Sequence, residues 1–234
     1  MNMNAENLVV AARRAGRSAL DESAGKTLLA AHGIRVPQSR VAKGVADAEA
    51  TVKGLQFPVV VKVMSPDILH KSDAGGVKIN LHSAAEVKAA IEGMLAAPKI
   101  KGARIDGFLI EEMAPPGHEL VIGGLRDPQF GPLVMVGLGG IFVEILKDVS
   151  FRLCPIARID AEEMLDELKG AAILKGARGG KPASREAIID VLLKIGGENG
   201  LLLKHAAEIS EADINPLIVS ESAAVAVDAR FILG

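Results

Sequence analysis

Residues 70–76 bring a histidine, a lysine, a serine and an aspartate together just before two adjacent glycines. His70 is the side chain in this stretch that could do covalent chemistry, because a neutral imidazole is a competent nucleophile near neutral pH. Gly75 and Gly76 carry no Cβ, so their backbone N–H groups could approach a phosphate closely. Glycines at the start of a strand also form turns and bulges, so this stretch alone leaves a structural and a chemical interpretation open.

A lysine lies in the β-branched run that precedes this loop. In FPVVVKVMS, residues 57–65, the pattern predicts a strand that begins at a proline, and Lys62 lies in its middle. A lysine buried without a partner is costly, so Lys62 lies either on a solvated face or against a bound anion. Together with the glycine loop, two adjacent strands with a lysine on one of them could cover a polyphosphate.

Oxygen-bearing side chains gather near the C-terminus. Asp213 and Asn215 are two positions apart in a predicted strand, so they share one face. If SESA, residues 220–223, is the tip of a hairpin, residues whose numbers add up to 443 face each other, and Asn215 lies opposite Asp228. Facing oxygen ligands that leave positions for water and substrate suit Mg²⁺ presented with nucleotide phosphates. The alternative is a simple turn before Pro216, with Asp228 as a surface carboxylate.

Two adjacent carboxylates, Glu111 and Glu112, end the apolar run in LIEEMAPPGHEL, next to a proline turn. Such carboxylates can serve only to solubilise a strand end. At a hinge between two lobes they can also present acceptors to a purine amine. The pattern leaves both uses open.

The composition restricts the classes of function. With 27 Lys and Arg against 29 Asp and Glu, the net charge of −2 offers no electrostatic footprint for nucleic acid or an anionic membrane. No apolar run approaches the roughly 18 residues that a membrane span requires, and the N-terminus lacks the apolar core of a signal peptide. One cysteine, Cys154, rules out an intramolecular disulfide. These features predict a cytoplasmic protein without nucleic-acid or membrane partners.

The remaining pattern predicts the elements that position these residues. Capping boxes at Ser18–Asp21 and Ser83–Glu86 predict two helices. SAGKT, residues 23–27, belongs to the first helix, because neither the strand nor the first glycine of a phosphate-binding P-loop precedes it. Strands and helices mix without a repeat, which indicates an α/β (α+β) fold. The predicted strands are 57–65, 75–82, 105–113, 118–126, 132–139, 212–220 and 223–233, and the predicted helices are 19–32, 84–97, 160–169 and 184–196.

Several stretches resemble the ATP-grasp subunit of the ADP-forming acetyl-CoA synthetases and, more distantly, the β subunit of succinyl-CoA synthetase. The resemblance runs from about Ser18 to the C-terminus and is carried by HGIRVPQSRVA, the lysine strand with its glycine loop, the block from EEMAPPGHELVIGG to FRLCPI, and DINPLIV. It implies a two-lobed ATP-grasp fold that grips the nucleotide. The implied division is an N-terminal extension at 1–17, a region 18–112 that includes the small nucleotide-grasping lobe, and a larger lobe 113–234 that ends in a metal-binding hairpin.

The resemblance also implies how the nucleotide is held. Lys62 contacts the α- and β-phosphates of ATP or ADP beside the glycine loop, and the end of the apolar strand forms a hinge around adenine. The implied nucleotide-binding residues are Lys62, Gly75, Gly76, Glu111, Glu112 and Met113.

In the implied mechanism, phosphate attacks an acyl-CoA on a partner subunit, and the acyl phosphate passes its phosphoryl group to a histidine there. The group then moves to His70, which carries it to ADP, while Asn215 and Asp228 hold Mg²⁺. The implied overall reaction is acid + CoA + ATP ⇌ acyl-CoA + ADP + phosphate. Phosphoryl transfer of this kind needs mainly in-line positioning and neutralisation of charge.

The same resemblance implies that CoA binding and the first phosphohistidine belong to an α-type partner, so we expect a hetero-oligomer and no turnover by the single chain. A second hypothesis is a non-catalytic ATP-grasp module in an assembly like those of protein lysine acetyltransferases. His70 favours the catalytic subunit, because a non-catalytic module needs no histidine in this loop. ATP-grasp ligases that join amines to carboxylates are disfavoured because they lack the histidine loop.

Overall fold

The structure is a computed structural model, and it divides the chain into two compact units. The small unit is Pro37–Ala114, and the large unit is Met1–Val36 together with Pro115–Gly234. Residues 5–68, 71–140, 143 and 145–234 are described.

Residues 18–36 are the part of the chain where this division differs from the predicted one. The region with the small lobe was expected to begin at residue 18, whereas the small unit begins at Pro37. The physical reason is that Leu28, Leu29 and Ile34 are buried in the core of the large unit. The second boundary, after residue 114, lies two residues from the expected one.

The small unit is built on a four-stranded antiparallel sheet in the order β1-β4-β2-β3. Val59, Val61 and Val63 alternate along β2, and they share one core with Val87 and Ile91 of α4, which covers that face of the sheet. Its elements are β1 (Ser39–Ala42), a 3₁₀ turn (Val45–Asp47), α3 (Ala48–Thr51), β2 (Val59–Met64), β3 (Val77–Leu81), α4 (Ala84–Ala96) and β4 (Gly107–Glu112).

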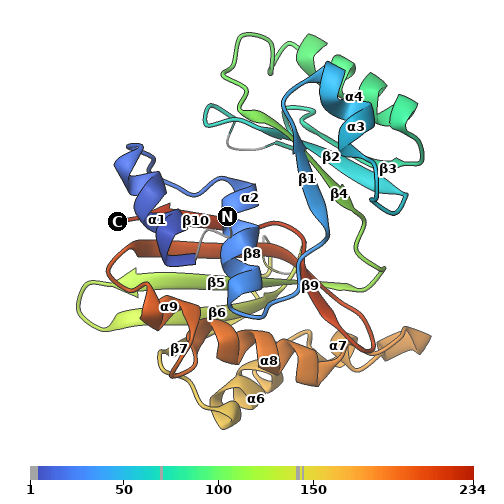
Figure 1. Cartoon of the computed structure of the whole chain (residues 1–234). Helices are drawn as coiled ribbons and strands as arrows, with labels where there is room; N and C mark the ends of the chain where they lie inside the picture. The colour runs from blue at the N-terminus through green and yellow to red at the C-terminus, as the bar shows by residue number, and fades with distance from the viewer. Residues whose placement is uncertain (1–4, 69–70, 141–142, 144) are drawn as a thin grey trace. The chain divides into compact units, whose positions relative to one another are not determined.

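The large unit is built on a six-stranded sheet in which β10, β8, β5, β6 and β7 follow one another and β9 pairs with β8. Figure 1 shows α6, α8 and α9 gathered on one side of it. Its strands are β5 (His118–Asp127), β6 (Gly131–Leu138), β7 (Val149–Leu153), β8 (Ile209–Val219), β9 (Ala224–Ala226) and β10 (Arg230–Leu233). Its helices are α1 (Ala5–Arg14), α2 (Glu22–Ala31), α6 (Arg158–Asp166), α7 (Ala171–Leu174), α8 (Arg185–Gly196) and α9 (Leu201–Lys204), with a 3₁₀ turn at Ala177–Gly179.

The two faces of the large sheet differ in what covers them. Alternate strand residues such as Ile122, Val136 and Ile214 are buried in one core with Ile188, Leu192 and other side chains of α8. The intervening residues point the other way, and two of them, Leu125 and Phe151, are half exposed. We call this second face the open face; its residues include Gly123, Leu125, Leu133, Met135, Phe151, Glu211 and Asp213.

Helix α2 begins three residues later than its predicted cap. Asp21, not Ser18, is the N-cap, and its carboxylate accepts a hydrogen bond from Ala24 N at 2.9 Å. Ser18 is used elsewhere, because its carbonyl accepts from Leu233 N and Leu20 N donates to Phe231 O. A tertiary strand pairing with β10 therefore replaces the first turn of the predicted helix.

Other predictions are confirmed with small shifts, and some elements were missed. Ser83 caps α4 as its spacing predicted, and Ser184, the first residue of the predicted helix 184–196, is the N-cap of α8. The closing stretch splits into β9 and β10, and the short strands β1 and β7 were not predicted. The N-terminal extension contains α1, whose Val9 reaches the large core. Within the described residues, every helix is too short or too polar to span a membrane.

Candidate functional site

Lys62 is buried and paired, not solvated. In the register of the small sheet it faces Leu109, while Glu111 faces Val60, so the two charged residues are diagonal neighbours on the face opposite the core. Lys62 Nζ lies 2.6 Å from Glu111 Oε1, and the two residues are only 5% and 0% exposed. The fold thus commits an ion pair to this face of the sheet, at the cost of removing both charges from water.

The glycine loop has a structural use for both of its glycines. Gly75 has a φ of +75°, which favours glycine, and a Cβ on Gly76 would overlap the Val63 side chain. Their N–H groups donate to Ser72 O at 3.0 Å and to Lys71 O at 2.7 Å, so both amides serve the turn itself. His70, the predicted phosphoryl carrier, lies outside the described residues.

The predicted adenine hinge at the end of β4 is held tightly inside the small unit. Glu112 N donates to Gln38 O at 3.0 Å, and Met113 N donates to Pro58 O at 3.2 Å. The Glu112 carboxylate accepts from Gln56 N at 2.8 Å. These two N–H groups are engaged, so the backbone groups that this strand end can offer a ligand are carbonyl oxygens, which would accept a hydrogen bond from an adenine amine.

The predicted hairpin register in the large unit is confirmed. Residues 217, 218 and 219 of β8 pair with residues 226, 225 and 224 of β9, and Asp213 of β8 pairs with Arg230 of β10. Between these ladders, Asn215 N donates to Asp228 O at 3.3 Å. Asn215 is therefore opposite Asp228, with Asp213 two residues away along the same face.

Electrostatics at this hairpin favour a bound cation. Desolvation raises the pKa of the Asp213 carboxyl above its usual value, the negative charge of Asp228 raises it further, and Arg230 opposes the shift. Two carboxylates and an amide oxygen are the donors that Mg²⁺ prefers. No group of three His, Cys, Asp or Glu side chains poised for a metal occurs in the described part of the chain.

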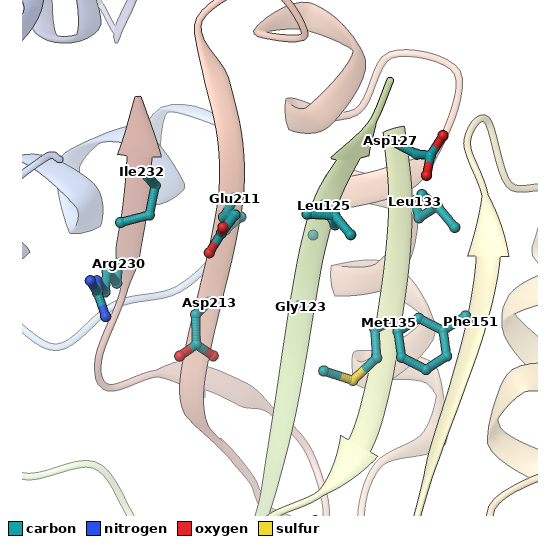
Figure 2. A pocket seen from close by; sticks show the side chains of 12 residues that line it. Gly123, Leu125, Asp127, Leu133, Met135, Phe151, Glu211, Asp213, Arg230 and Ile232 are labelled. Carbon is teal, nitrogen blue, oxygen red and sulfur yellow. The ribbon is translucent and has the colours of Figure 1, made fainter. Parts of the chain in front are cut away.

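An open pocket of about 470 Å³ lies on the open face beside these acids. Figure 2 shows Glu211 and Asp213 of β8 and Arg230 of β10 along one side, and Met135 and Phe151 of β6 and β7 along the other. Charged side chains predominate on the side of β8 and β10, which also has Ile232, and apolar side chains on the side of β6 and β7, where Asp127 lies nearby. Such a lining suits a ligand that has a charged and an apolar part.

Sequence reasoning did not identify the apolar half of this pocket. Met135 pairs with Gly123 on one side and with Phe151 on the other, so the three residues form one row across β5, β6 and β7. The available signal was that the predicted strands 118–126 and 132–139 are apolar on both faces, which predicts that neither face is fully exposed to solvent. Because β7 was not predicted, Phe151 could not be placed in this row.

The ATP-grasp domain family matches residues 11–233, so the chain belongs to the ATP-grasp family. The structure agrees with the predicted two-lobed fold, with one antiparallel sheet in each unit. Within this family the relatives narrow the assignment.

The chain is 46% identical to the β subunit of ADP-forming acetate–CoA ligase I from Pyrococcus furiosus, over 96% of each chain. It is 44% identical to acetyl-coenzyme A synthetase 1 from Ca. Korarchaeum cryptofilum, with a TM-score of 0.92 over 98% of this chain and 100% of that one. That structure contains coenzyme A and Ca-AMPCP, and another structure of the same synthetase contains Mg-AMPPCP. These similarities identify a subunit of an ADP-forming acyl-CoA synthetase.

Two further relatives bear on subunit organisation and descent. An ADP-forming acetate–CoA ligase of Archaeoglobus fulgidus is 45% identical over 90% of this chain, but the match covers only 30% of that longer protein. The counterpart of this chain is thus a separate β subunit in one organism and part of a larger chain in another. The β subunit of succinate–CoA ligase from Halobacterium salinarum, at 28% identity over 219 residues, is a distant homologue.

Proposed function

We propose that the chain is the nucleotide-binding subunit that exchanges a phosphoryl group with ADP in the reaction acid + CoA + ATP ⇌ acyl-CoA + ADP + phosphate. The observation that carries this proposal is the hairpin register, which sets Asn215 against Asp228 beside Asp213. Oxygen donors at this spacing, next to an open pocket, are suited to a nucleotide with its Mg²⁺.

In this proposal the small unit contributes the phosphate and adenine contacts. The carboxylate of Glu111 holds the amino group of Lys62, which would contact the α- and β-phosphates. Gly75 and Gly76 give the loop its conformation, and the strand end at Glu112 and Met113 forms the adenine hinge.

Asn215 and Asp228 would hold Mg²⁺ in the large unit. The ion, when bound, neutralises charge on the phosphate oxygens during transfer. Asn215 and Asp228 are held in place before the ion binds, because their backbones are hydrogen-bonded to each other next to the paired strands β8 and β9. Asp213, two positions before Asn215 on the same face, would be a further neighbour of the ion.

His70 would act as the phosphoryl carrier. A histidine nitrogen of His70 forms a P–N bond as the P–N bond of the partner's phosphohistidine breaks, and the phosphoryl group then passes to a β-phosphate oxygen of ADP, forming ATP. The α-type partner would supply CoA binding and the first phosphohistidine. The separate β subunit and the longer fused relative support this division of labour.

The test is ATP formation from acyl-CoA, ADP and labelled phosphate by the chain reconstituted with its α-type partner. His70→Ala should abolish ATP formation and leave ADP binding intact. His82→Ala is the matched control, because His82 is an exposed histidine near the end of β3 in the same unit. Unaltered ATP formation by His70→Ala would remove the carrier role, and net acyl-CoA synthesis by the single chain would remove the division of labour.

A further inference from the structure

The chain just before and just after helix α2 is hydrogen-bonded to β10 and β9, the two strands that flank Asp228. Before the helix, Leu20 N donates to Phe231 O of β10 at 3.0 Å. After the helix, Arg35 O accepts from Ala226 N of β9 at 2.8 Å. Asp228 lies in the connection between β9 and β10. The segments that flank α2 are therefore hydrogen-bonded to the strand on each side of this connection.

The middle of α2 lies against the same connection. A Cβ on Gly25 would lie 3.1 Å from the carbonyl oxygen of Ala229 and 3.2 Å from the ring of Phe231. Contacts this short show that the helix backbone itself packs on the residue next to Asp228. The Asp228 carboxylate in turn accepts from Ala229 N at 2.8 Å, so Ala229 links the helix to the proposed metal ligand.

The same face of α2 contains a buried ion pair. Lys26 Nζ donates to Glu22 Oε1 at 3.0 Å, and the two residues are only 2% and 7% exposed. Glu22, Gly25 and Lys26 are three and four positions apart, so they share one helix face. Ion pairs at this spacing are ordinarily exposed to solvent and contribute little to stability. Burial of this pair costs free energy, because both charges lose their contact with water.

We propose that Glu22 and Lys26 are positioning residues for the metal site. Their ion pair fixes the face of α2 that packs on Ala229 and thereby fixes the backbone and carboxylate of Asp228. The SAGKT lysine, which is not part of a P-loop, acquires a function in this way. This inference rests on the proposed function, since it takes Asp228 as a ligand of Mg²⁺.

The test uses Mn²⁺ as the spectroscopic probe for Mg²⁺, with the full chain and saturating ADP. Electron paramagnetic resonance measures the dissociation constant of Mn²⁺, and equilibrium dialysis measures ADP binding without metal. The double variant Glu22→Gln/Lys26→Met should weaken Mn²⁺ by about 10-fold or more, as loss of outer-shell support does at other metal sites. Binding of metal-free ADP should stay within about twofold, because the nucleotide contacts of the small unit are intact.

The double variant also separates positioning from folding. Replacing both members of a buried pair is often neutral for stability, whereas removing one leaves an uncompensated charge. Far-ultraviolet circular dichroism checks the fold. The control is Arg158→Met/Glu162→Gln, which removes an exposed pair of the same spacing from α6, together with the exposed pair between Arg158 and Glu186, and should leave the Mn²⁺ affinity unchanged.

Gly25→Ala probes the same contact with a single methyl group, which must displace Ala229 O or the Phe231 ring by a few tenths of an ångström. It should weaken Mn²⁺ in the same direction. In the Asp228→Asn background, neither the double variant nor Gly25→Ala should weaken Mn²⁺ further, which a general structural defect would not reproduce. Wild-type affinity in the folded double variant would overturn the positioning role alone; absence of Mn²⁺ binding by the wild-type chain would overturn the proposed function with it.

Discussion

The two units treat the charges of their candidate sites in opposite ways. In the small unit Lys62 and Glu111 have opposite charge, are buried, and satisfy each other at 2.6 Å. In the large unit, desolvation and the like charge of Asp228 raise the pKa of the Asp213 carboxyl. In the small unit the two charges neutralise each other before a ligand binds. In the large unit the two carboxylates repel each other until a cation binds and neutralises them.

Under the proposed function, the two regions would make two different kinds of contribution to phosphoryl transfer. A preorganised lysine needs no reorganisation when phosphate binds, which is the property expected of a group that stabilises transferred charge. A pair of repelling carboxylates stores an electrostatic cost that a divalent cation removes, so the same repulsion favours metal binding.

Lys62→Met should produce the largest effect, because it leaves the Glu111 carboxylate buried without its cation. We expect a loss of about 3–5 kcal/mol in the free energy of unfolding. Urea unfolding followed by circular dichroism measures it, since the chain has no Trp or Tyr for fluorescence. The control is Lys62→Met/Glu111→Leu, which should regain most of the stability without regaining nucleotide affinity. A single variant as stable as the wild type would show that the pair is not buried in solution.

Gly76→Ala should destabilise the small unit by about 1–3 kcal/mol, because the added methyl group overlaps Val63 in the core beneath the loop. Gly93→Ala is the control within the same unit: Gly93 lies in α4 with open space around its Cβ position, so alanine should stabilise the helix by up to about 1 kcal/mol. Equal effects from the two substitutions would contradict the assigned packing. Thermal denaturation of the two variants in parallel is sufficient.

Asp213→Asn should raise the stability of the metal-free chain, because it removes the repulsion from Asp228. The gain should be below about 1 kcal/mol, since the side chain retains contact with solvent. Glu211→Gln, two residues earlier on the same face, should change the stability less. A clear destabilisation by Asp213→Asn would mean that the attraction of Asp213 to Arg230 outweighs desolvation and the repulsion from Asp228, and the contrast between the units would weaken.

The ion pair between Arg152 and Glu167 lies outside both candidate sites, and we expect its removal to have the smallest effect on stability. Hydrogen bonds from Arg152 and Ser150 lower the pKa of Glu167 from 4.5 to about 2. A carboxyl with a lowered pKa contributes stability above its unfolded pKa and loses it as the pH falls through the folded value. The wild type should therefore be more stable than Glu167→Gln at pH 7, and the difference should shrink between pH 4.5 and about 2. Calorimetry across that range measures it, and a constant difference would contradict the assigned interaction.

Local signals in the sequence predicted the parts of the fold that depend on neighbouring residues. The capping box at Ser83 predicted one helix start, and the helix predicted from residue 184 begins where Ser184 is the N-cap. The SESA turn predicted the register that sets Asn215 opposite Asp228. The cap at Ser18 failed because β10, from the far end of the sequence, pairs with that segment. Tertiary pairing of this kind leaves no local trace.

The same distinction between local and tertiary signals holds for the site residues. The spacing of Asp213, Asn215 and Asp228 was sufficient to predict their shared hairpin, because strand periodicity determines it. The contact between Lys62 and Glu111 was not predictable, since it depends on how β2 and β4 are aligned in the sheet. The burial of Lys26 was also unexpected, because an i, i+4 pair on a helix gives no sign of which face will be covered.

The attachment of α2 to β9 and β10 has a consequence for how the molecule is made. The small unit is one continuous segment, so it can fold on the ribosome as soon as β4 has emerged. Residues 18–36, although synthesised earlier, must wait for β10, because their partners are the last strands to be translated. Throughout that interval the leucines of this segment lack their native contacts with β10, so the first segment of the large unit completes its packing only when the last strand has been translated.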